Sequence, residues 1–256
     1  MKFLIQKING QVVHDFAFTL LESIRFHNWL QHNGKNCEIK VRYLDYIEIS
    51  EPDDIYPIQF QKYHKSYIPI GSVEFVSEFL GYFYNIKLKP INVPEELFGY
   101  ANRDIFNDDE SGIYSCIGKW FVKSNDKIKS YSELIDCGNW IVLDNISVEY
   151  PPIGNYQYSK YINIDSEWRA FVYKGKLVGL QNYSGKFTRF PNVDKIEGMI
   201  QAYASAPIAY TLDVGVNDEG TFVVEVHNMF SVGLYGFADH SILPKMFYDS
   251  FKEILK

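Results

Sequence analysis

The sequence predicts an α+β protein, with helices and strands mixed along the chain and antiparallel hairpins dominating its second half. Two stretches, 167–183 and 210–228, each read as two β-runs joined by a short polar turn. Apolar residues recur at helical spacing over 16–32 and again over 242–255. No internal repeat or low-complexity segment interrupts this mixture, which is typical of a globular enzyme-sized domain or a few small lobes.

The first half is expected to contain three strands and two helices. The dipeptide Asn9-Gly10 is a strong two-residue hairpin signal, and it would join the first two strands. Ser72 and Glu74 are typical of a helix start, because serine caps free backbone N–H groups and glutamate suits the positive end of the helix dipole. The expected strands are 3–8, 11–16 and 37–44, and the expected helices are 16–32 and 72–83.

The second half is expected to alternate hairpins with shorter helices. Ser130 and Glu133 have capping-box spacing and predict a short helix. Asp194 with Glu197 predicts the start of another helix, which Pro207 would stop. The remaining expected elements are strands at 119–124 and 140–146, the two hairpins, and the last helix at 242–255.

Charge, apolar runs and cysteines limit the classes of function. The 256-residue chain has a net charge of −7, which argues against binding duplex nucleic acid, because that requires a basic face. No apolar run is long enough to cross a bilayer and the first residues do not form a secretory signal, so a cytoplasmic protein without a membrane partner is expected. Cys37, Cys116 and Cys137 form no metal-binding pattern and are expected to be buried thiols.

The second hairpin carries the most informative pattern. A three-residue loop ending at Gly220 would pair Asn217 with Thr221 and, counting back, Asp213 with Glu225. Opposed carboxylates repel each other, and a fold tolerates them when a divalent cation such as Mg²⁺ sits between them. The alternative is an exposed acidic pair, and a longer loop would shift the pairing. The other face of this hairpin would be apolar, with Val214, Val216, Phe222 and Val224.

Basic residues on two other predicted strands suit phosphate or carboxylate binding. Glu167 and Arg169 would share one strand face, where the guanidinium could hold an anion with two hydrogen bonds or simply form a cross-strand salt bridge. Lys123 lies on a strand face with Lys119 and Phe121, where a lysine either faces nucleotide phosphates or is a solvated surface residue.

Several common catalytic patterns are missing from the sequence. It has no Walker or G-x-G-x-x-G sequence, no G-x-S-x-G and no H-E-x-x-H. His227 would share the strand face of Glu225, which raises the chance that this histidine belongs to a site.

Five segments in order resemble the ATP-grasp superfamily. The similarity is greatest between 119 and 237 and points to the clade, common in phages and bacteria, that is named for one arginine and two lysines. The resemblance implies two α+β lobes that clasp a nucleotide (106–256), preceded by a small α/β domain (1–105). The segments are K-W-F-V-K (119–123), D-K-I-K (126–129), E-W-R-A-F-V-Y-K-G-K-L-V-G (167–179), D-V-G-V (213–216) and E-V-H-N (225–228).

The resemblance also implies ATP and Mg²⁺ as cofactors and assigns residues to them. Arg169 and Lys129 would be catalytic, the first by stabilising charge on the transferring phosphoryl group. ATP would be bound by Lys123, Lys129, Val142, Leu143, Asp144, Ile146, Glu167 and Arg169, and Mg²⁺ by Asp213, Glu225, His227 and Asn228.

The implied activity is an ATP-dependent carboxylate–amine ligase that forms an amide through an acyl-phosphate, on a small-molecule or peptide substrate. One departure from the superfamily is that His227 stands where asparagine usually follows the metal-binding glutamate, with Asn228 one residue later. Imidazole is a poor ligand for a hard cation. The alternative function is therefore a catalytically degenerate nucleotide-binding or interaction protein.

Overall fold

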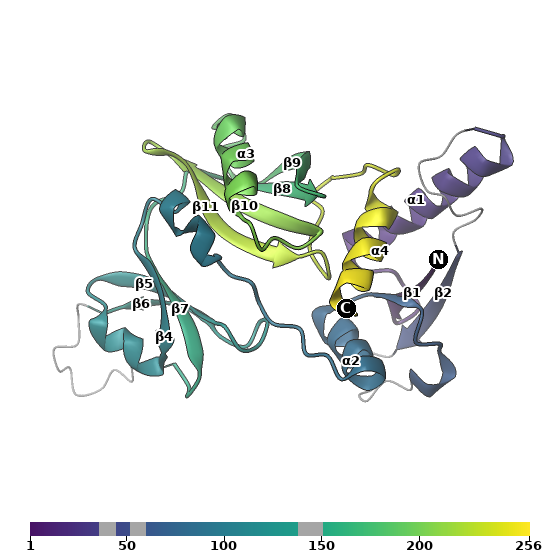
Figure 1. Ribbon diagram of the computed structural model, residues 1–256, viewed down its shortest axis with the longest axis horizontal. Helices are drawn as coiled ribbons and strands as arrows, with labels where there is room; N and C mark the ends of the chain where they lie inside the picture. The colour runs from purple at the N-terminus through teal and green to yellow at the C-terminus, as the bar shows by residue number, and fades with distance from the viewer. Residues whose placement is uncertain (36–44, 52–59, 138–150) are drawn as a thin grey trace.

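A computed structural model describes residues 1–35, 45–51, 60–137 and 151–256, which form three β-sheets with helices packed around them (Figure 1). The strands are β1 (Lys2–Ile8), β2 (Asp45–Glu51), β3 (Ile68–Ile70), β4 (Ile105–Asp109), β5 (Lys119–Ser124), β6 (Ser132–Asp136), β7 (Asn155–Lys160), β8 (Ser166–Tyr173), β9 (Lys176–Gly185), β10 (Ala209–Asn217) and β11 (Gly220–Asn228). The helices are α1 (Asp15–His32), α2 (Val73–Tyr84), α3 (Val193–Ala202) and α4 (Leu243–Ile254), with 3₁₀ turns at 60–62, 95–100 and 110–115.

The N-terminal sheet is parallel, with strand order β2-β1-β3, and packs with α1, α2 and α4. Helix α2 begins as its sequence predicts, because Oγ of Ser72 accepts a hydrogen bond from the backbone N–H of Phe75. The core around β1 also contains Phe247 and Phe251 of α4, so the end of the chain returns to the first sheet.

The central sheet is antiparallel, with strand order β11-β10-β8-β9, and α3 packs against one of its faces. Strand β10 is buried over almost its whole length, because it has a neighbouring strand on each side and covered faces. The side chains of Val214, Ile196 and Met199 lie in the core between the sheet and the helix. This rigid central strand carries Asp213.

The third sheet is also antiparallel, with strand order β4-β7-β5-β6, and has a small core of its own. In that core Phe106 stacks on Tyr158, with ring centroids 4.8 Å apart. Cys116 and Cys137 are buried there as free thiols, as expected for these two cysteines. Figure 1 shows this sheet beside the central one and away from the N-terminal sheet.

The predicted α+β class is confirmed, as are both predicted hairpins of the second half and the helices predicted at 16–32, at 72–83, from Asp194 and at 242–255. The strand predicted at 11–16 is wrong: Asn9 and Gly10 do turn the chain, but only Gln11 bridges back to Ile8 before α1 begins at Asp15. The strand predictions at 37–44 and 140–146 lie outside the described residues.

The short helix predicted at Ser130 is also wrong. Residues Ser132–Asp136 form β6, which pairs with β5 in the register Lys119↔Asp136. Pairing with a neighbouring strand outweighs a local capping pattern, which is only a weak preference. Oγ of Ser130 instead donates to the backbone carbonyl of Lys127 within the β5–β6 connection.

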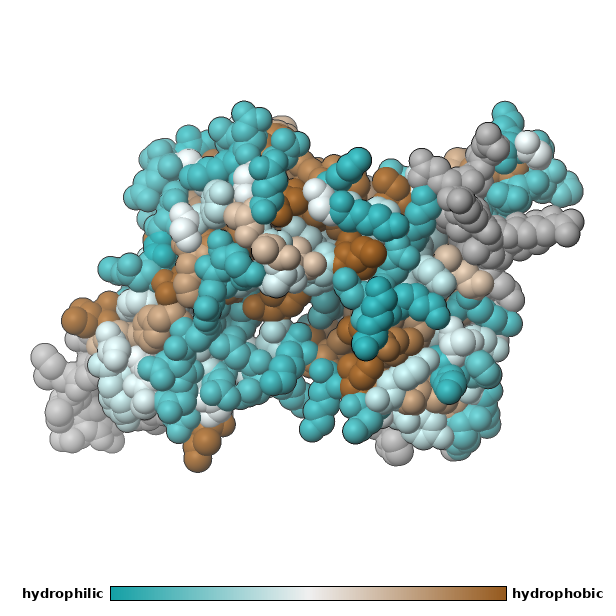
Figure 2. All heavy atoms as spheres, in the orientation of Figure 1, coloured by the Kyte–Doolittle hydropathy of each residue, from teal (hydrophilic) through white to brown (hydrophobic). Residues whose placement is uncertain are grey.

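The face in Figure 2 is mainly hydrophilic, with smaller hydrophobic areas spread across it. Within the described part of the chain, no helix has both the length and the apolar character needed to span a membrane. The core around β1 takes residues from both sides of position 105. The division into 1–105 and 106–256 stays a prediction.

Candidate functional site

Asp213, Arg169 and Glu225 lie side by side on three adjacent strands. Asp213 on β10 pairs with Glu225 on β11 and, on its other side, with Arg169 on β8. Directly paired residues in a sheet direct their side chains to the same face, so all three face one side of the central sheet. The opposed carboxylates predicted from the sequence are therefore confirmed.

The turn and the register of this hairpin differ from the predicted ones, although Asp213 and Glu225 still pair. Asn217 pairs with Gly220, not with Thr221, so the turn has two residues, and a β-bulge between the pairs of Asp213 and Val214 restores the register. Val224 is the extra residue of the bulge, since Val214 pairs with Val223 and Asp213 with Glu225.

The bulge also changes which valine and which aromatic ring face the apolar core. Val223, not Val224, joins the core beneath the sheet. Phe222 pairs with Gly215, and a Cβ on that glycine would lie 2.5 Å from the phenyl ring. The prediction that Phe222 and Val224 share the face of Val214 is therefore wrong, because a two-residue turn shifts that end of the strand by one residue.

Arg169 is held tightly against Asp213. Its Nε and Nη2 donate hydrogen bonds to the two carboxylate oxygens of Asp213, at 2.8 and 2.7 Å, and Nη1 donates to the carbonyl of Gly233 at 3.0 Å. The guanidinium lies over the rings of Tyr183 and Tyr235, which stack on each other with centroids 5.0 Å apart. Both charged side chains are less than a tenth exposed. The cross-strand salt bridge left open as an alternative is thus present.

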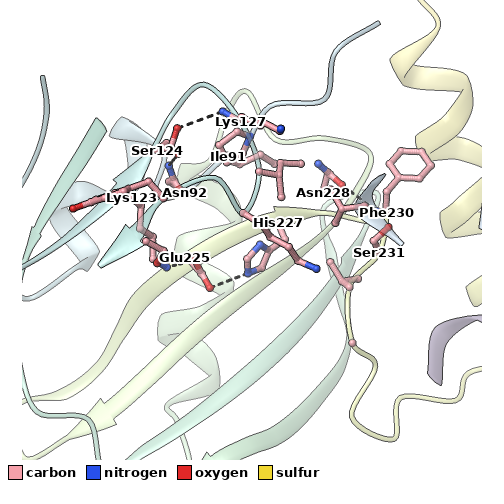
Figure 3. Close-up of a pocket in the computed structure, with 18 of the residues that line it drawn as sticks. Ile91, Asn92, Lys123, Ser124, Lys127, Glu225, His227, Asn228, Phe230 and Ser231 are labelled. Carbon is pink, nitrogen blue, oxygen red and sulfur yellow. Dashed lines mark hydrogen bonds and ion pairs between the residues drawn. The ribbon is translucent and has the colours of Figure 1, made fainter. Parts of the chain in front are cut away.

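Glu225 has two cationic neighbours (Figure 3). Nζ of Lys123, from β5 of the third sheet, donates to Oε2 of Glu225. Nε2 of His227 lies 3.0 Å from Oε1 of Glu225 and 3.6 Å from Oδ2 of Asp213, close enough for ion pairs with both. The central and third sheets therefore meet at this glutamate.

The charges at this centre set its protonation states. Burial alone would raise the pKa of both carboxyls, but Arg169 and His227 hold the pKa of Asp213 below its usual value, and His227 and Lys123 do the same for Glu225. Burial also opposes the charged form of His227, yet the two carboxylates outweigh it and raise its pKa to about 9. The histidine is therefore an imidazolium at neutral pH.

Asn228 does not join this centre. It pairs with Tyr210 in an unbroken register, so the strand does not bulge to turn Asn228 toward Glu225. Its Oδ1 instead accepts a hydrogen bond from the backbone N–H of Phe230 (Figure 3). Of the four residues predicted for the metal, the structure brings Asp213, Glu225 and His227 together, with ligand atoms all within 4.8 Å of one another.

A cavity of about 360 Å³ opens beside this centre and is lined by basic side chains. It lies between β5, the end of β11, the 230–235 segment and the start of α2. Lys129 lines it in a left-handed backbone conformation, with φ of 57°. The cationic lining residues are Lys123, Lys127, Lys129, Arg169 and His227.

A second cavity of about 350 Å³ shares Asn92, Lys123 and Glu225 with the first and has a slightly more apolar wall. The connection between β7 and β8 contributes to its wall, together with Phe121 from β5. Glu167 also lines it and accepts a hydrogen bond from the hydroxyl of Tyr183. The apolar lining residues of the connection are Tyr161, Ile162 and Ile164.

The sequence model of the ATP-grasp domain, R2K clade family 2, matches residues 100–244, which is more than half of the chain. The protein belongs to this family. The resemblance found in the sequence is therefore confirmed, and the strands of the central and third sheets all lie within the matched residues. No curated protein matches the sequence.

Solved structures similar to this ATP-grasp protein include two of D-alanine–D-alanine ligase from Bacillus anthracis, one of them complexed with ATP. Each aligns over 99% of this chain and 98% of the ligase, with TM-scores of 0.49 and identities of 10% and 12%. Another is N5-carboxyaminoimidazole synthetase from Staphylococcus aureus, which covers 89% of this chain and 71% of its own, at a TM-score of 0.48 and 12% identity.

The carboxylates of the ATP-grasp protein fit the divalent cation that the family implies. Asp213 and Glu225 offer oxygen atoms from opposed positions on one sheet face, and hard oxygen ligands suit Mg²⁺. His227 fits less well, because imidazole nitrogen is a poor ligand for Mg²⁺ and an imidazolium has no lone pair to offer.

Four of the residues that the resemblance assigns to ATP fall outside the described part of the chain, and one residue that lines both cavities was not found from the sequence. Val142, Leu143, Asp144 and Ile146 lie outside the described residues. Asn92 was missed: its carbonyl accepts from the backbone N–H of Val226, and its Nδ2 donates to the carbonyl of Ser124, so it joins the central and third sheets. The only sequence signal at Asn92 is its position between Pro90 and Pro94. That pattern predicts a loop but does not predict the contacts that the loop makes.

Proposed function

We propose that this ATP-grasp protein is an ATP-dependent carboxylate–amine ligase that forms an amide bond through an acyl-phosphate. The observation that supports this most is that Lys123 and Glu225 line both the basic cavity and the second cavity, whose wall includes Phe121, Ile162 and Ile164. ATP has an apolar base at one end and an anionic phosphate chain at the other, so it suits both cavities at once.

In this proposal the base occupies the cavity lined by Phe121 and Ile164, and the phosphate chain extends past Lys123. An aromatic and branched aliphatic lining suits a flat base, while the lysine offers charge-assisted hydrogen bonds to phosphate. Lys129, from the β5–β6 connection, then faces the γ-phosphate end of the phosphate chain.

The chemistry proposed for the basic cavity has two steps. A carboxylate oxygen of the substrate attacks the γ-phosphorus, ADP leaves, and an amine then displaces phosphate from the acyl-phosphate. Mg²⁺ bound by Asp213 and Glu225 would neutralise phosphate charge. Arg169 is fixed by Asp213 and by the carbonyl of Gly233, so it offers its positive charge to the cavity without reorganising.

The test is ADP release by the purified protein with Mg²⁺, across a panel of amino acids and small peptides. The expected result is slow release with ATP alone and a rise when one panel member supplies the carboxylate or the amine. Mass spectrometry then identifies an amide product. ATP binding without ADP release under every condition would contradict the ligase proposal.

The second candidate is a nucleotide-binding protein that has lost catalysis. His227 favours it, because an imidazolium already lies between the two carboxylates that a cation would use. Such a protein would bind ATP with little dependence on Mg²⁺ and would release no ADP. Measuring ATP affinity with and without Mg²⁺ separates it from the ligase.

A further inference from the structure

Arg103 contacts the β-bulge that sets the position of Glu225. Its Nη1 donates to the carbonyl of Val223 at 2.7 Å, and its Nη2 donates to the carbonyl of Val224 at 3.1 Å. Val224 is the extra residue of that bulge. Strand β11 lies at an edge of the central sheet, so none of the described strands pairs with these carbonyls.

The same guanidinium reaches the third sheet. Nε of Arg103 donates to Oγ of Ser159 on β7 at 2.6 Å, and Nη1 also donates to the carbonyl of Ala101. The guanidinium carbon lies 5.9 Å from the ring centroid of Phe222. Burial lowers the pKa of Arg103 to about 10, with the charge of Glu225 opposing, so the side chain is charged at neutral pH. A charged group held by four hydrogen bonds is well suited to fix two chain segments together.

The bulge matters because side chains on a strand alternate between two faces. With a two-residue turn and no bulge, Asp213 would pair with Val224, and Glu225 would pair with Leu212. Leu212 faces the apolar core between the sheet and α3, so Glu225 would leave the face that carries Asp213. The one extra residue keeps both carboxylates on the same face.

We infer that Arg103 is a positioning residue: by binding the carbonyls of Val223 and Val224, it holds the bulge that places Glu225 opposite Asp213. The inference rests on the proposed function only in taking Glu225 as a ligand of the cation. Arg103 acts on the cation through Glu225 and the backbone. Neighbours that orient a metal ligand are worth about 10–100-fold in metal affinity.

The test compares Arg103→Gln and Arg103→Lys with the wild type and with the control Arg189→Gln. Arg189 also contacts this hairpin, through an ion pair with Asp218 in its turn, but it lines neither cavity. Three quantities are measured: Mn²⁺ affinity by electron paramagnetic resonance with a non-hydrolysable ATP analogue, adenosine affinity without metal, and hydrogen exchange of the 221–228 amides.

Arg103 also lines the second cavity. Arg103→Gln is therefore expected to weaken adenosine binding slightly, to weaken Mn²⁺ binding more, by about tenfold, and to speed exchange around Val224 and Val226. Arg103→Lys should weaken Mn²⁺ binding less, because one ammonium keeps the charge but cannot span both carbonyls and Ser159. Arg189→Gln should change neither Mn²⁺ affinity nor exchange near the bulge.

Unchanged exchange in Arg103→Gln would overturn the inference whether or not the protein binds nucleotide. An equal loss of adenosine and Mn²⁺ affinity would also overturn it, because Arg103 would then contact the nucleotide directly. If the wild type binds neither Mn²⁺ nor adenosine, the proposed function fails, and the exchange comparison alone decides the structural role of Arg103.

Discussion

Arg169 and Asp213 are directly opposite each other on β8 and β10, and the arginine occupies both carboxylate oxygens of the aspartate. An acidic residue in a family metal site would be expected to keep its oxygens free. Each carboxylate oxygen has two lone pairs, so Asp213 can bind the guanidinium and still offer a ligand. In the proposed ligase, this one contact would orient both a metal ligand and an anion-binding group.

Asp213→Asn is expected to abolish ATP turnover and to lower the free energy of unfolding by about 3 kcal/mol, because it leaves a buried guanidinium without its counter-charge. Urea unfolding gives the stability change, and ADP release at a temperature where the variant is fully folded gives the activity. Wild-type turnover in a folded Asp213→Asn protein would remove this residue from the site.

The double variant Arg169→Met with Asp213→Leu separates stability from catalysis. Replacing both members of a buried ion pair by apolar residues is often neutral, so it should recover much of the stability lost in Asp213→Asn. Turnover should stay absent, because the site loses both the guanidinium of Arg169 and the carboxylate of Asp213. A double variant as unstable as the single one would show that the pair contributes packing that leucine and methionine do not replace.

His227→Asn is expected to tighten Mg²⁺ binding. The substitution replaces a cation lying 3.0 Å from Glu225 by a neutral side chain whose oxygen suits a hard cation. Isothermal titration with Mg²⁺ in the presence of an ATP analogue measures the change. His227→Gln serves as the control for loss of the charge with a longer amide. If neither substitution strengthens Mg²⁺ binding, the imidazolium does not compete with the cation.

How far the sequence predicts the site depends on which contacts are local. The spacing of Asp213 and Glu225 in one hairpin was enough to predict that they pair. The observed turn is one residue shorter than the predicted one, and the strand contains a one-residue bulge that was not predicted. These two differences cancel, so the correct pair followed from an incorrect register. In the observed register Phe222 packs over Gly215, and that contact is not visible in a β-run pattern.

Contacts between distant segments could not be predicted. Arg103 lies in a stretch that reads as a loop, and its carbonyl partners come from β11, about 120 residues later. Tyr183 and Tyr235 approach Arg169 from β9 and from the loop after β11. In a chain with 20 tyrosines, composition alone does not indicate which ones lie at the site. The family resemblance located the lysines and the acids, whose roles stay predictions.

The thiols of the third sheet are expected to be unreactive. Burial raises the pKa of Cys116 to about 12 and also raises the pKa of Cys137. Both thiols stay protonated at pH 8. Because burial favours the protonated thiol, its contribution to the stability of the fold is complete at pH values below the pKa of a cysteine in the unfolded chain, near 8.5. This contribution is lost as the pH rises toward 12. Alkylation with iodoacetamide at pH 8, followed by peptide mass spectrometry, should leave both unmodified in the native protein and modify both in urea. Rapid native modification would contradict their burial.

Lys123→Met is expected to weaken ATP binding by at least about tenfold, since a hydrogen bond to a charged group is worth about 1.5–3 kcal/mol. Lys119→Met is the matched control, because Lys119 lies on the same face of β5, four residues away and exposed, and lines neither cavity. Fluorescence titration with a labelled ATP analogue measures both affinities. Glu225 keeps His227 as a cationic neighbour in Lys123→Met, so the variant should fold. An equal loss of ATP affinity in the two variants would mean that only the overall charge of the protein affects binding, and that the phosphates do not contact Lys123.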